Sequence, residues 1–302
     1  MRPEKTINAI PEKELFTKGH SACAGCSTPI IVRHALKAAG KDTVVVNATG
    51  CLEVFSTPYP VTSWKVPWVH AAFENASAVA SGVVRSLKKT NKNSNVLVFG
   101  GDGGTFDIGF QSLSGAAERG ENICYVCYDN EAYMNTGIQR SGSTPKFAST
   151  TTSPDGKKIH GKTEFKKNLP FILAAHNAYV AVTNVAFPHD IIKRITKGLE
   201  HNGFAFILIL SPCPTGWKFP SHMTIEIAKL AFKTHIYPMY EIENGVVTIT
   251  RKPSNHTPVQ EYLKHQGRFR HVTPSQLEEI QEHVNENWER IEKLDDYKLK
   301  LF

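Results

Sequence analysis

Two short apolar runs, each followed at once by small or polar residues, most constrain how this chain can fold. Residues 96–99 predict a buried strand, because four apolar residues follow one another there. The glycine-rich stretch 100–104 comes next and contains Asp102. A second apolar run, 123–128, predicts another buried strand, which leads through an aspartate into Asn130. If these strands are parallel, Asp102 and Asn130 lie at the same sheet edge, where open α/β sheets bind ligands.

The residue types at this edge indicate a bound phosphate and a metal ion. Glycines at 101 and 103 allow backbone N–H groups to approach a phosphate closely, and the following helix, with Asp107 near its start, would favour an anion at its N-terminus. A carboxylate and a side-chain carbonyl, together with diphosphate oxygens, make a suitable oxygen shell for Mg²⁺.

Gly101-Asp102-Gly103, followed 28 residues later by Asn130, resembles the metal–diphosphate motif of thiamine diphosphate enzymes. The continuation, Glu131-Ala132-Tyr133-Met134-Asn135-Thr136-Gly137, resembles the β subunits of the 2-oxoacid:ferredoxin oxidoreductases, in particular those that act on pyruvate. The resemblance covers nearly the whole of residues 19–220 and is weak beyond them.

This resemblance implies a set of site residues. It implies that Asp102, Asn130 and the carbonyl of Ala132 bind Mg²⁺, and that the backbone of Gly101 and Gly103 meets the diphosphate. Asn135 is implied as the catalytic residue facing the reacting carbon. The further cofactor-binding residues that it implies are Gly50, Cys51 and Thr136.

Four of the six cysteines are expected at the same sheet edge. Cys23 and Cys26 lie in a loop of small residues, Cys51 follows a predicted strand at 43–47, and Cys213 follows another at 205–210. Four converging thiolates suit either a tetrahedral zinc ion or a 4Fe–4S cluster. The resemblance implies the cluster, because the family binds one through segments that match HSACAGC, NATGC and SPCPTGW here.

The remaining cysteines, Cys124 and Cys127, also form a CxxC pair, but they lie on a predicted strand. Residues three apart on a strand point to opposite faces of the sheet, so both cannot bind one metal centre. We therefore interpret these two thiols as buried packing residues.

The resemblance also implies a reaction and partners. Pyruvate would be decarboxylated oxidatively with CoA to acetyl-CoA and CO₂, reversibly, and electrons would pass through the cluster to ferredoxin. The glutamate that activates thiamine diphosphate has no matching motif here, so an α subunit is expected to supply it. Further γ and δ (ferredoxin-like) subunits are expected in the complex.

Strands alternate with helices through residue 217, and this alternation predicts an α/β fold with a doubly wound, mostly parallel sheet. The resemblance implies that this sheet is of the thiamine-diphosphate-binding type. We expect a single domain over 1–302, with a core at 19–220 and an α+β extension at 221–302. The extension should contain a hairpin turning at Asn244-Gly245 and an amphipathic helix at 276–294. Other segments are interpreted as an irregular arm at 1–18, an irregular aromatic stretch at 52–69, a helix at 70–89 and an active-site or interface loop at 136–162.

Composition narrows the possible partners. The net charge is +7 over 302 residues, yet the lysines are scattered and no basic stripe interleaves with aromatic residues, so nucleic-acid binding is not expected. An acidic electron carrier, a diphosphate or CoA would explain the charge equally well. The charged N-terminus and the short longest apolar run, 204–210, predict neither a signal peptide nor a membrane span, so a cytoplasmic protein is expected.

Three other functions remain open at this point. A non-redox thiamine diphosphate enzyme would not need four convergent cysteines. A non-catalytic scaffold or electron-transfer subunit would use the fold without binding the cofactor. The third possibility is the same redox chemistry on another 2-oxoacid, such as oxalate, 2-oxoglutarate or a branched-chain acid.

Overall fold

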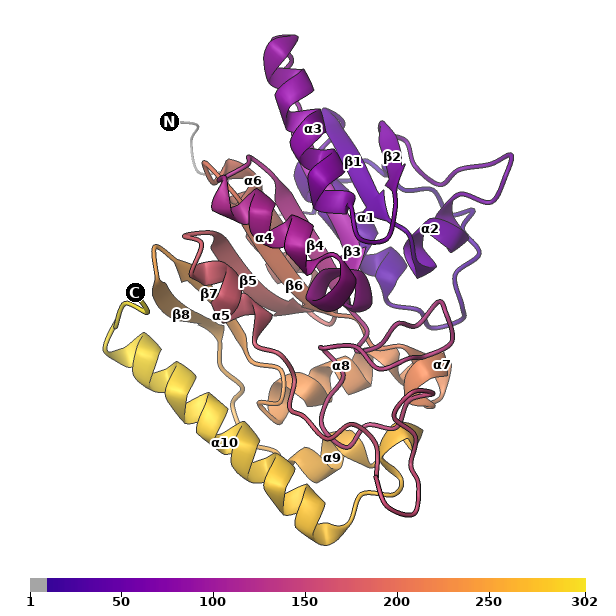
Figure 1. Ribbon diagram of the computed structural model, residues 1–302, viewed down its shortest axis with the longest axis vertical. Helices are drawn as coiled ribbons and strands as arrows, with labels where there is room; N and C mark the ends of the chain where they lie inside the picture. The colour runs from indigo at the N-terminus through magenta and orange to yellow at the C-terminus, as the bar shows by residue number, and fades with distance from the viewer. Residues whose placement is uncertain (1–9) are drawn as a thin grey trace.

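The chain forms one eight-stranded sheet, seen in a computed structural model that describes residues 10–302 (Figure 1). Half of the predicted N-terminal arm, residues 1–9, lies outside the described residues. The strand order is β2-β1-β3-β4-β6-β5-β7-β8. The strands are β1 (Thr43–Ala48), β2 (Trp68–Ala71), β3 (Asn95–Gly101), β4 (Cys124–Asp129), β5 (Tyr179–Asn184), β6 (Ala205–Leu210), β7 (Met239–Glu243) and β8 (Val246–Arg251).

Strands β1 to β6 all run parallel, which confirms the predicted doubly wound sheet. Strands β4, β5 and β6 are buried over their whole length, as expected for strands covered on both faces, whereas the edge strand β2 leaves Val69 and His70 exposed. The helices are α1 (Thr28–Ala39), α2 (Cys51–Ser56), α3 (Ala76–Lys89), α4 (Phe110–Glu118), α5 (Leu169–Ala174), α6 (Pro188–Glu200), α7 (Pro214–Trp217), α8 (Thr224–Lys233), α9 (Val259–Leu263) and α10 (Pro274–Asp296), with a π-helix η1 (Gly103–Ile108).

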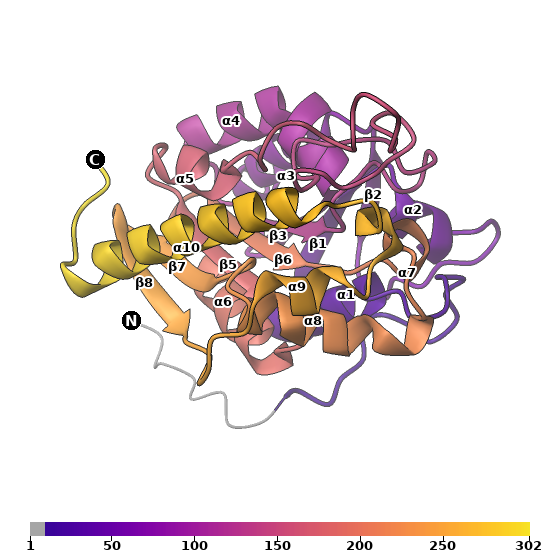
Figure 2. The ribbon, with the colours of Figure 1, turned by 90° about the horizontal axis from the view of Figure 1, so that it is seen from below.

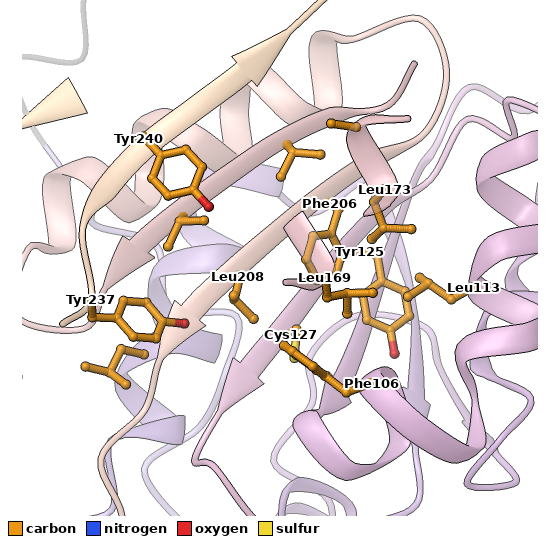
Figure 3. Packing of buried hydrophobic residues seen from close by; sticks show 14 of the residues in the cluster. Phe106, Leu113, Tyr125, Cys127, Leu169, Leu173, Phe206, Leu208, Tyr237 and Tyr240 are labelled. Carbon is orange, nitrogen blue, oxygen red and sulfur yellow. The ribbon is translucent and has the colours of Figure 1, made fainter. Parts of the chain in front are cut away.

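Helices cover both faces of the sheet (Figure 2). Helices α1 and α6 pack on one face, where Ile31 and Ile195 are fully buried. Helices α3, α4 and α5 pack on the other face, and Figure 3 shows Leu113, Tyr125 and Phe206 meeting in that layer. Because both layers consist mainly of packed apolar side chains, the polar groups of the site lie at the carboxyl ends of the strands.

Two predictions about the stretch after β1 are wrong. The irregular stretch predicted at 52–69 contains helix α2, and the helix predicted at 70–89 begins only at Ala76, because Trp68–Ala71 forms the edge strand β2. Strand β2 pairs with β1 through a register that places Val69 opposite Val46. A four-residue edge strand has too few residues to show a period of two, so pairing with β1 rather than local pattern decides its conformation.

The predicted hairpin forms and extends the sheet. Strand β7 pairs antiparallel with β5, and β8 pairs with β7. The turn falls at Asn244 and Gly245, both with positive φ, as a tight hairpin turn requires. Helix α10 begins with a capping box formed by Thr273 and Gln276 and packs along β8. That 221–302 forms an extension of a single domain stays a prediction.

Helix α10 is fixed to α8 by a stacked pair of rings that makes the stability depend on pH. The ring of His235 lies 4.1 Å from that of Trp288, nearly parallel to it. Burial, helped by His256, lowers the pKa of His235 to about 4. Between pH 4 and 6.5, the His235 ring therefore binds its second proton more tightly in the unfolded chain than in the folded one. The free energy of unfolding consequently falls as the pH falls through that window.

We expect a loss of about 1–2 kcal/mol from pH 6.5 to pH 4 from this residue, after allowing for its partial exposure. His235→Asn tolerates the positive φ and should flatten that part of the profile in urea denaturation. His189→Asn, which changes an exposed histidine on α6, should keep the wild-type slope. Equal slopes for the two variants would contradict the assignment.

Among the helices of residues 10–302, none combines the length and apolar character needed to cross a bilayer.

Candidate functional site: a diphosphate and metal cradle at the carboxyl edge

The site is built where neighbouring strands β3 and β4 end. Gly101 of β3 pairs with Tyr128 of β4, so Asp102 and Asp129 leave the sheet side by side. After Asp102 the chain enters a π-helical turn, and such turns often occur at functional sites. The sequence prediction that Asp102 and Asn130 meet is thus supported by a backbone hydrogen bond: Asn130 N–H donates to Asp102 Oδ1 at 3.2 Å.

Three oxygens face one another at the predicted metal position. The side-chain oxygen of Asn130 faces Asp102 Oδ1 and the carbonyl oxygen of Ala132, both of which can only accept hydrogen bonds. Without a cation, the amide satisfies both by turning its nitrogen toward them, at 2.9 Å from each. With a cation bound, the side-chain oxygen of Asn130 can keep facing the other two oxygens, because all three then share one positive charge. These residues therefore fit a hard divalent ion such as Mg²⁺.

The electrostatics of Asp102 also favour a cation. Its side chain is fully buried, and burial together with the neighbouring Asp129 raises the pKa of Asp102 well above its usual range. Ser141 Oγ donates a hydrogen bond to its second oxygen at 2.5 Å, which opposes that rise only in part. A divalent ion would remove the cost of holding this carboxylate ionised.

Glycines form the floor beside these oxygens. A Cβ on Gly103 would lie 2.6 Å from the ring of Tyr133, and one on Gly104 would lie 3.1 Å from Phe73, so larger residues would close the space. The adjoining cavity has a volume of about 130 Å³. Its walls are formed by Thr49, Gly50, Cys51, Phe73, Gly101, Gly103, Gly104, Tyr128, Asn130, Ala132, Tyr133, Met134, Asn135 and Thr136.

The other predicted cofactor residues all line this cavity. Gly50 and Cys51 approach from β1, where Gly50 precedes helix α2. Asn135 and Thr136 approach from the loop after β4, and Asn135 is exposed to solvent. Thr136 Oγ1 donates to Gln139 Oε1 at 2.5 Å, so this hydroxyl is already used within its own turn. Whether these four contact a cofactor stays a prediction.

The loops that carry the cysteines are tied together by hydrogen bonds. Ser27, next to Cys26, bonds to the hydroxyl of Ser211 at 2.9 Å and to the carbonyl of Pro212 at 3.0 Å, next to Cys213. On the other side of the CxxC turn, the Gly25 carbonyl accepts a bond from Thr224 at 2.6 Å. These bonds hold the CxxC loop against the end of β6, as the sequence predicts.

The four thiols are close enough for their charges to interact. Burial raises the pKa of Cys51 to about 12, and Cys213, Cys26 and Cys23 contribute to that rise. Burial likewise raises the pKa of Cys213 to about 11. Positioned thiols that resist ionisation alone release their protons when a metal binds them. The donor set fits an iron–sulfur centre.

Within residues 10–302, no three His, Cys, Asp or Glu side chains are close enough to hold a single metal ion. A tetrahedral zinc site needs its sulfurs about 3.8 Å apart. In a 4Fe–4S cluster each thiolate binds a different iron, so its ligands are farther apart. That the four cysteines bind such a cluster stays a prediction.

Cys124 and Cys127 lie as expected for packing residues. Both are buried on β4, and they belong to the cores on opposite faces of the sheet. Neither can therefore reach the four other cysteines.

Sequence reasoning missed a buried charge network behind the cradle. Asp129 accepts hydrogen bonds from Tyr237 at 3.0 Å and from Lys166. Glu131 pairs with Arg268 at 2.6 Å and with Lys166 at 3.4 Å. These contacts join the loop after β4 to residues of the C-terminal region.

The same network reaches the metal position through an aromatic ring. The Arg268 guanidinium lies 3.9 Å from the ring centre of Trp217, and Trp217 Nε1 donates to the carbonyl of Asn130 at 2.7 Å. In the sequence, only the run of three polar residues Asp129-Asn130-Glu131 indicated this network. Polar residues that follow a buried strand require hydrogen-bond partners. Nothing in the spacing identified which cations those are.

Comparison with known proteins places this site in a class. Residues 48–209 match the family described as "Thiamine pyrophosphate enzyme, C-terminal TPP binding domain". The match runs from the last residue of β1 almost to the end of β6 and includes every residue that lines the cavity. The fold and the site thus define a thiamine diphosphate enzyme domain.

Curated relatives narrow the class to a family. The chain is 55% identical to pyruvate synthase subunit PorB of Methanocaldococcus jannaschii, over 93% of this chain and 97% of that protein. It is 46% identical to the PorB subunit of Thermotoga maritima, over 94% of each chain. The chain belongs to the pyruvate synthase subunit PorB family and is a subunit of a 2-oxoacid oxidoreductase.

Two further comparisons give the breadth of the fold. The chain is 42% identical to the ketoisovalerate oxidoreductase subunit VorB of Pyrococcus furiosus, over 94% of each. It also resembles a solved 2-oxoglutarate:ferredoxin oxidoreductase from Magnetococcus marinus, with a TM-score of 0.58 at 24% identity, over 75% of this chain and 82% of the other. At that identity the structural likeness supports the fold.

Proposed function

We propose that this chain is the β subunit of a pyruvate:ferredoxin oxidoreductase. The complex converts pyruvate, CoA and two oxidised ferredoxins to acetyl-CoA, CO₂, a proton and two reduced ferredoxins, and the reaction is reversible. Thiamine diphosphate, when bound, supplies the electron sink that decarboxylation of a 2-oxoacid requires. This chain's own residues hold the cofactor, bring the acceptor of the electrons close and exclude water.

Asp102, Asn130 and the Ala132 carbonyl hold Mg²⁺ in this proposal, and the backbone of Gly101 and Gly103 holds the diphosphate. The position of the Asn130 amide beside the oxygens of Asp102 and Ala132 supports the metal assignment, because its oxygen can face the same point as those two oxygens when a cation is bound. Fixed oxygens and backbone N–H groups orient the cofactor without reorganisation during the reaction.

The observation that carries the proposal is the position of Cys51. This cysteine lines the same cavity as Gly101, Gly103 and Asn130. A 4Fe–4S cluster held by Cys23, Cys26, Cys51 and Cys213 would therefore sit next to the cofactor and accept electrons directly. A non-redox thiamine enzyme has no use for a thiolate centre at this place.

The cavity also supports a role for partner subunits. Among the described residues that line it, none is a carboxylate, so the glutamate that activates the cofactor comes from another chain, the α subunit. The γ and δ subunits and ferredoxin complete the electron path in this proposal. The complex acts in the cytoplasm. Asn135 faces the same cavity from its open side and is positioned to meet the substrate.

Pyruvate is the substrate that the relatives favour. The relatives at 55% and 46% identity are named pyruvate synthase subunits. A branched-chain 2-oxoacid is the second candidate, because the VorB subunit at 42% identity is named for ketoisovalerate.

The complex, purified without oxygen with its partner subunits, tests the proposal. We expect about four irons and four acid-labile sulfides for the centre in this chain. We also expect CoA-dependent viologen reduction that is fastest with pyruvate, compared with 2-oxoisovalerate, 2-oxoglutarate and oxalate. Zinc or no metal at the four cysteines would overturn the redox proposal, and a preference for 2-oxoisovalerate would change only the substrate.

A further inference from the structure

A second cavity lies between the sheet and helix α10, on the side of the C-terminal hairpin. Its volume is about 360 Å³, within the range of small-molecule sites. Its walls are mostly apolar and include Phe171, Leu208, Leu263 and Val284. Figure 3 shows Leu208 and Tyr240 in this region of the core, on neighbouring parts of the sheet. Apolar walls indicate an occupant with an apolar body.

Tyr240 brings a hydroxyl to this cavity. Tyr240 lines it and is only 5% exposed, yet within residues 10–302 its hydroxyl forms no hydrogen bond. Its ring packs edge-on against Phe171, with 6.2 Å between ring centres. A ligand oxygen that enters the cavity can accept a hydrogen bond from this hydroxyl.

A cation without a carboxylate partner lies beside the same ring. Arg290, on α10, also lines the cavity, and its guanidinium stands 5.3 Å from the ring centre of Phe171. In the described part of the chain its side chain bonds only to the neutral oxygen of Asn287, at 3.2 Å. Tyr240 and Arg290 thus converge on Phe171 from the sheet and from the helix.

The other charges at this cavity are already balanced. Lys146 pairs with Glu279, and Lys167 pairs with Asp107 at 3.3 Å. Lys166 and Glu131, both at the wall, pair with each other at 3.4 Å. Arg290 is therefore the charge left to bind an anion.

We propose that this cavity binds a small aliphatic or aryl monocarboxylate. The carboxylate accepts hydrogen bonds from the Arg290 guanidinium and the Tyr240 hydroxyl, and the apolar body packs against Phe171, Leu208 and Val284. Arg suits this role because its planar donors match a carboxylate and it remains charged at every relevant pH. A second carboxylate is disfavoured, because the remaining cations already have partners.

The test uses the purified complex and two probes of the same shape, 4-methylpentanoate and its neutral amide. We expect the acid to bind with a Kd on the order of 0.1–1 mM by isothermal titration, as its size allows. The amide should bind at least about 10-fold more weakly, because it lacks the charge that Arg290 pairs with.

Three variants locate the binding. Arg290→Gln should weaken binding of the acid about 10-fold, and Tyr240→Phe about 5-fold, since it removes only the hydroxyl. Lys293→Gln makes the same charge change on α10 at an exposed residue outside the cavity walls and should leave the Kd unchanged.

Several outcomes overturn the proposal. Equal binding of acid and amide, or equal effects of Arg290→Gln and Lys293→Gln, would show that no carboxylate binds there. Binding to the isolated chain but not to the complex would show that another subunit fills the cavity. None of these results bears on the iron content or on the reaction at the thiamine site, so the two proposals fail separately.

Discussion

Cys51→Ala is expected to lower pyruvate-dependent viologen reduction below about 1% of wild type while leaving thiamine diphosphate binding within a few-fold. The reason is that the proposed cluster would lose one of its four thiolates, whereas the oxygens of Asp102, Asn130 and Ala132 are untouched. Iron and sulfide analysis, viologen reduction and equilibrium binding of thiamine diphosphate with Mg²⁺ together check this result.

A variant at a second cysteine distinguishes loss of the proposed cluster from a change in the cavity wall. Cys213 does not line the cavity, so Cys213→Ala should also lose iron and activity, with no effect on cofactor binding. Cys124→Ala is the matched control, because this buried cysteine lies on the strand β4 and cannot reach the centre. If Cys124→Ala lost iron as Cys51→Ala does, instability rather than ligation would explain the loss.

Asp102→Asn is expected to have the opposite pattern. Affinity for thiamine diphosphate with Mg²⁺ should fall at least about 100-fold, because the carboxylate proposed to bind Mg²⁺ becomes a neutral amide, and the iron content should stay at the wild-type value. The free energy of unfolding of the cofactor-free chain should rise, because burial and Asp129 raise the pKa of Asp102 and its ionised form is costly without a cation. Calorimetric binding, iron analysis and urea denaturation check the three parts.

Asp107→Asn is the control for this variant. Asp107 accepts a hydrogen bond from Gly142 N–H at 2.7 Å, so it holds the same loop that Ser141 belongs to without facing the metal position. It should keep most of the cofactor affinity. A similar loss in both variants would mean that loop geometry, not the metal-binding carboxylate, controls binding. Loss of iron in Asp102→Asn would mean that the two centres are not independent.

The part of the site that sequence reasoning predicted is local to single strand ends. Asp102 follows β3 and Asn130 follows β4, and parallel neighbours bring such positions together without further information. The convergence of the cysteine loops is predicted only from their common sheet edge, because β1 and β6, which Cys51 and Cys213 follow, are separated by β3 and β4. The register of adjacent parallel strands is therefore what makes the meeting of Asp102 and Asn130 predictable.

What could not be predicted depends on contacts between distant segments. The edge strand Trp68–Ala71 forms because β1 offers a pairing edge, and its four residues alone do not specify it. Likewise, Lys166 and Arg268 neutralise Asp129 and Glu131 only after the loop and the C-terminal region have docked. No rule of sequence spacing predicts that residues 131 and 268 meet, because the chain between them changes direction at several independent turns.

The network of Asp129, Glu131, Lys166 and Arg268 limits how this subunit can be recombined. A chimera that took the segment after residue 220 from a relative would have to keep an arginine at 268, or it would leave Glu131 buried with only part of its counter-charge. Tyr237 would have to be kept too, since it donates to Asp129. The loop after β4 and the C-terminal segment therefore have to be exchanged together in such a chimera.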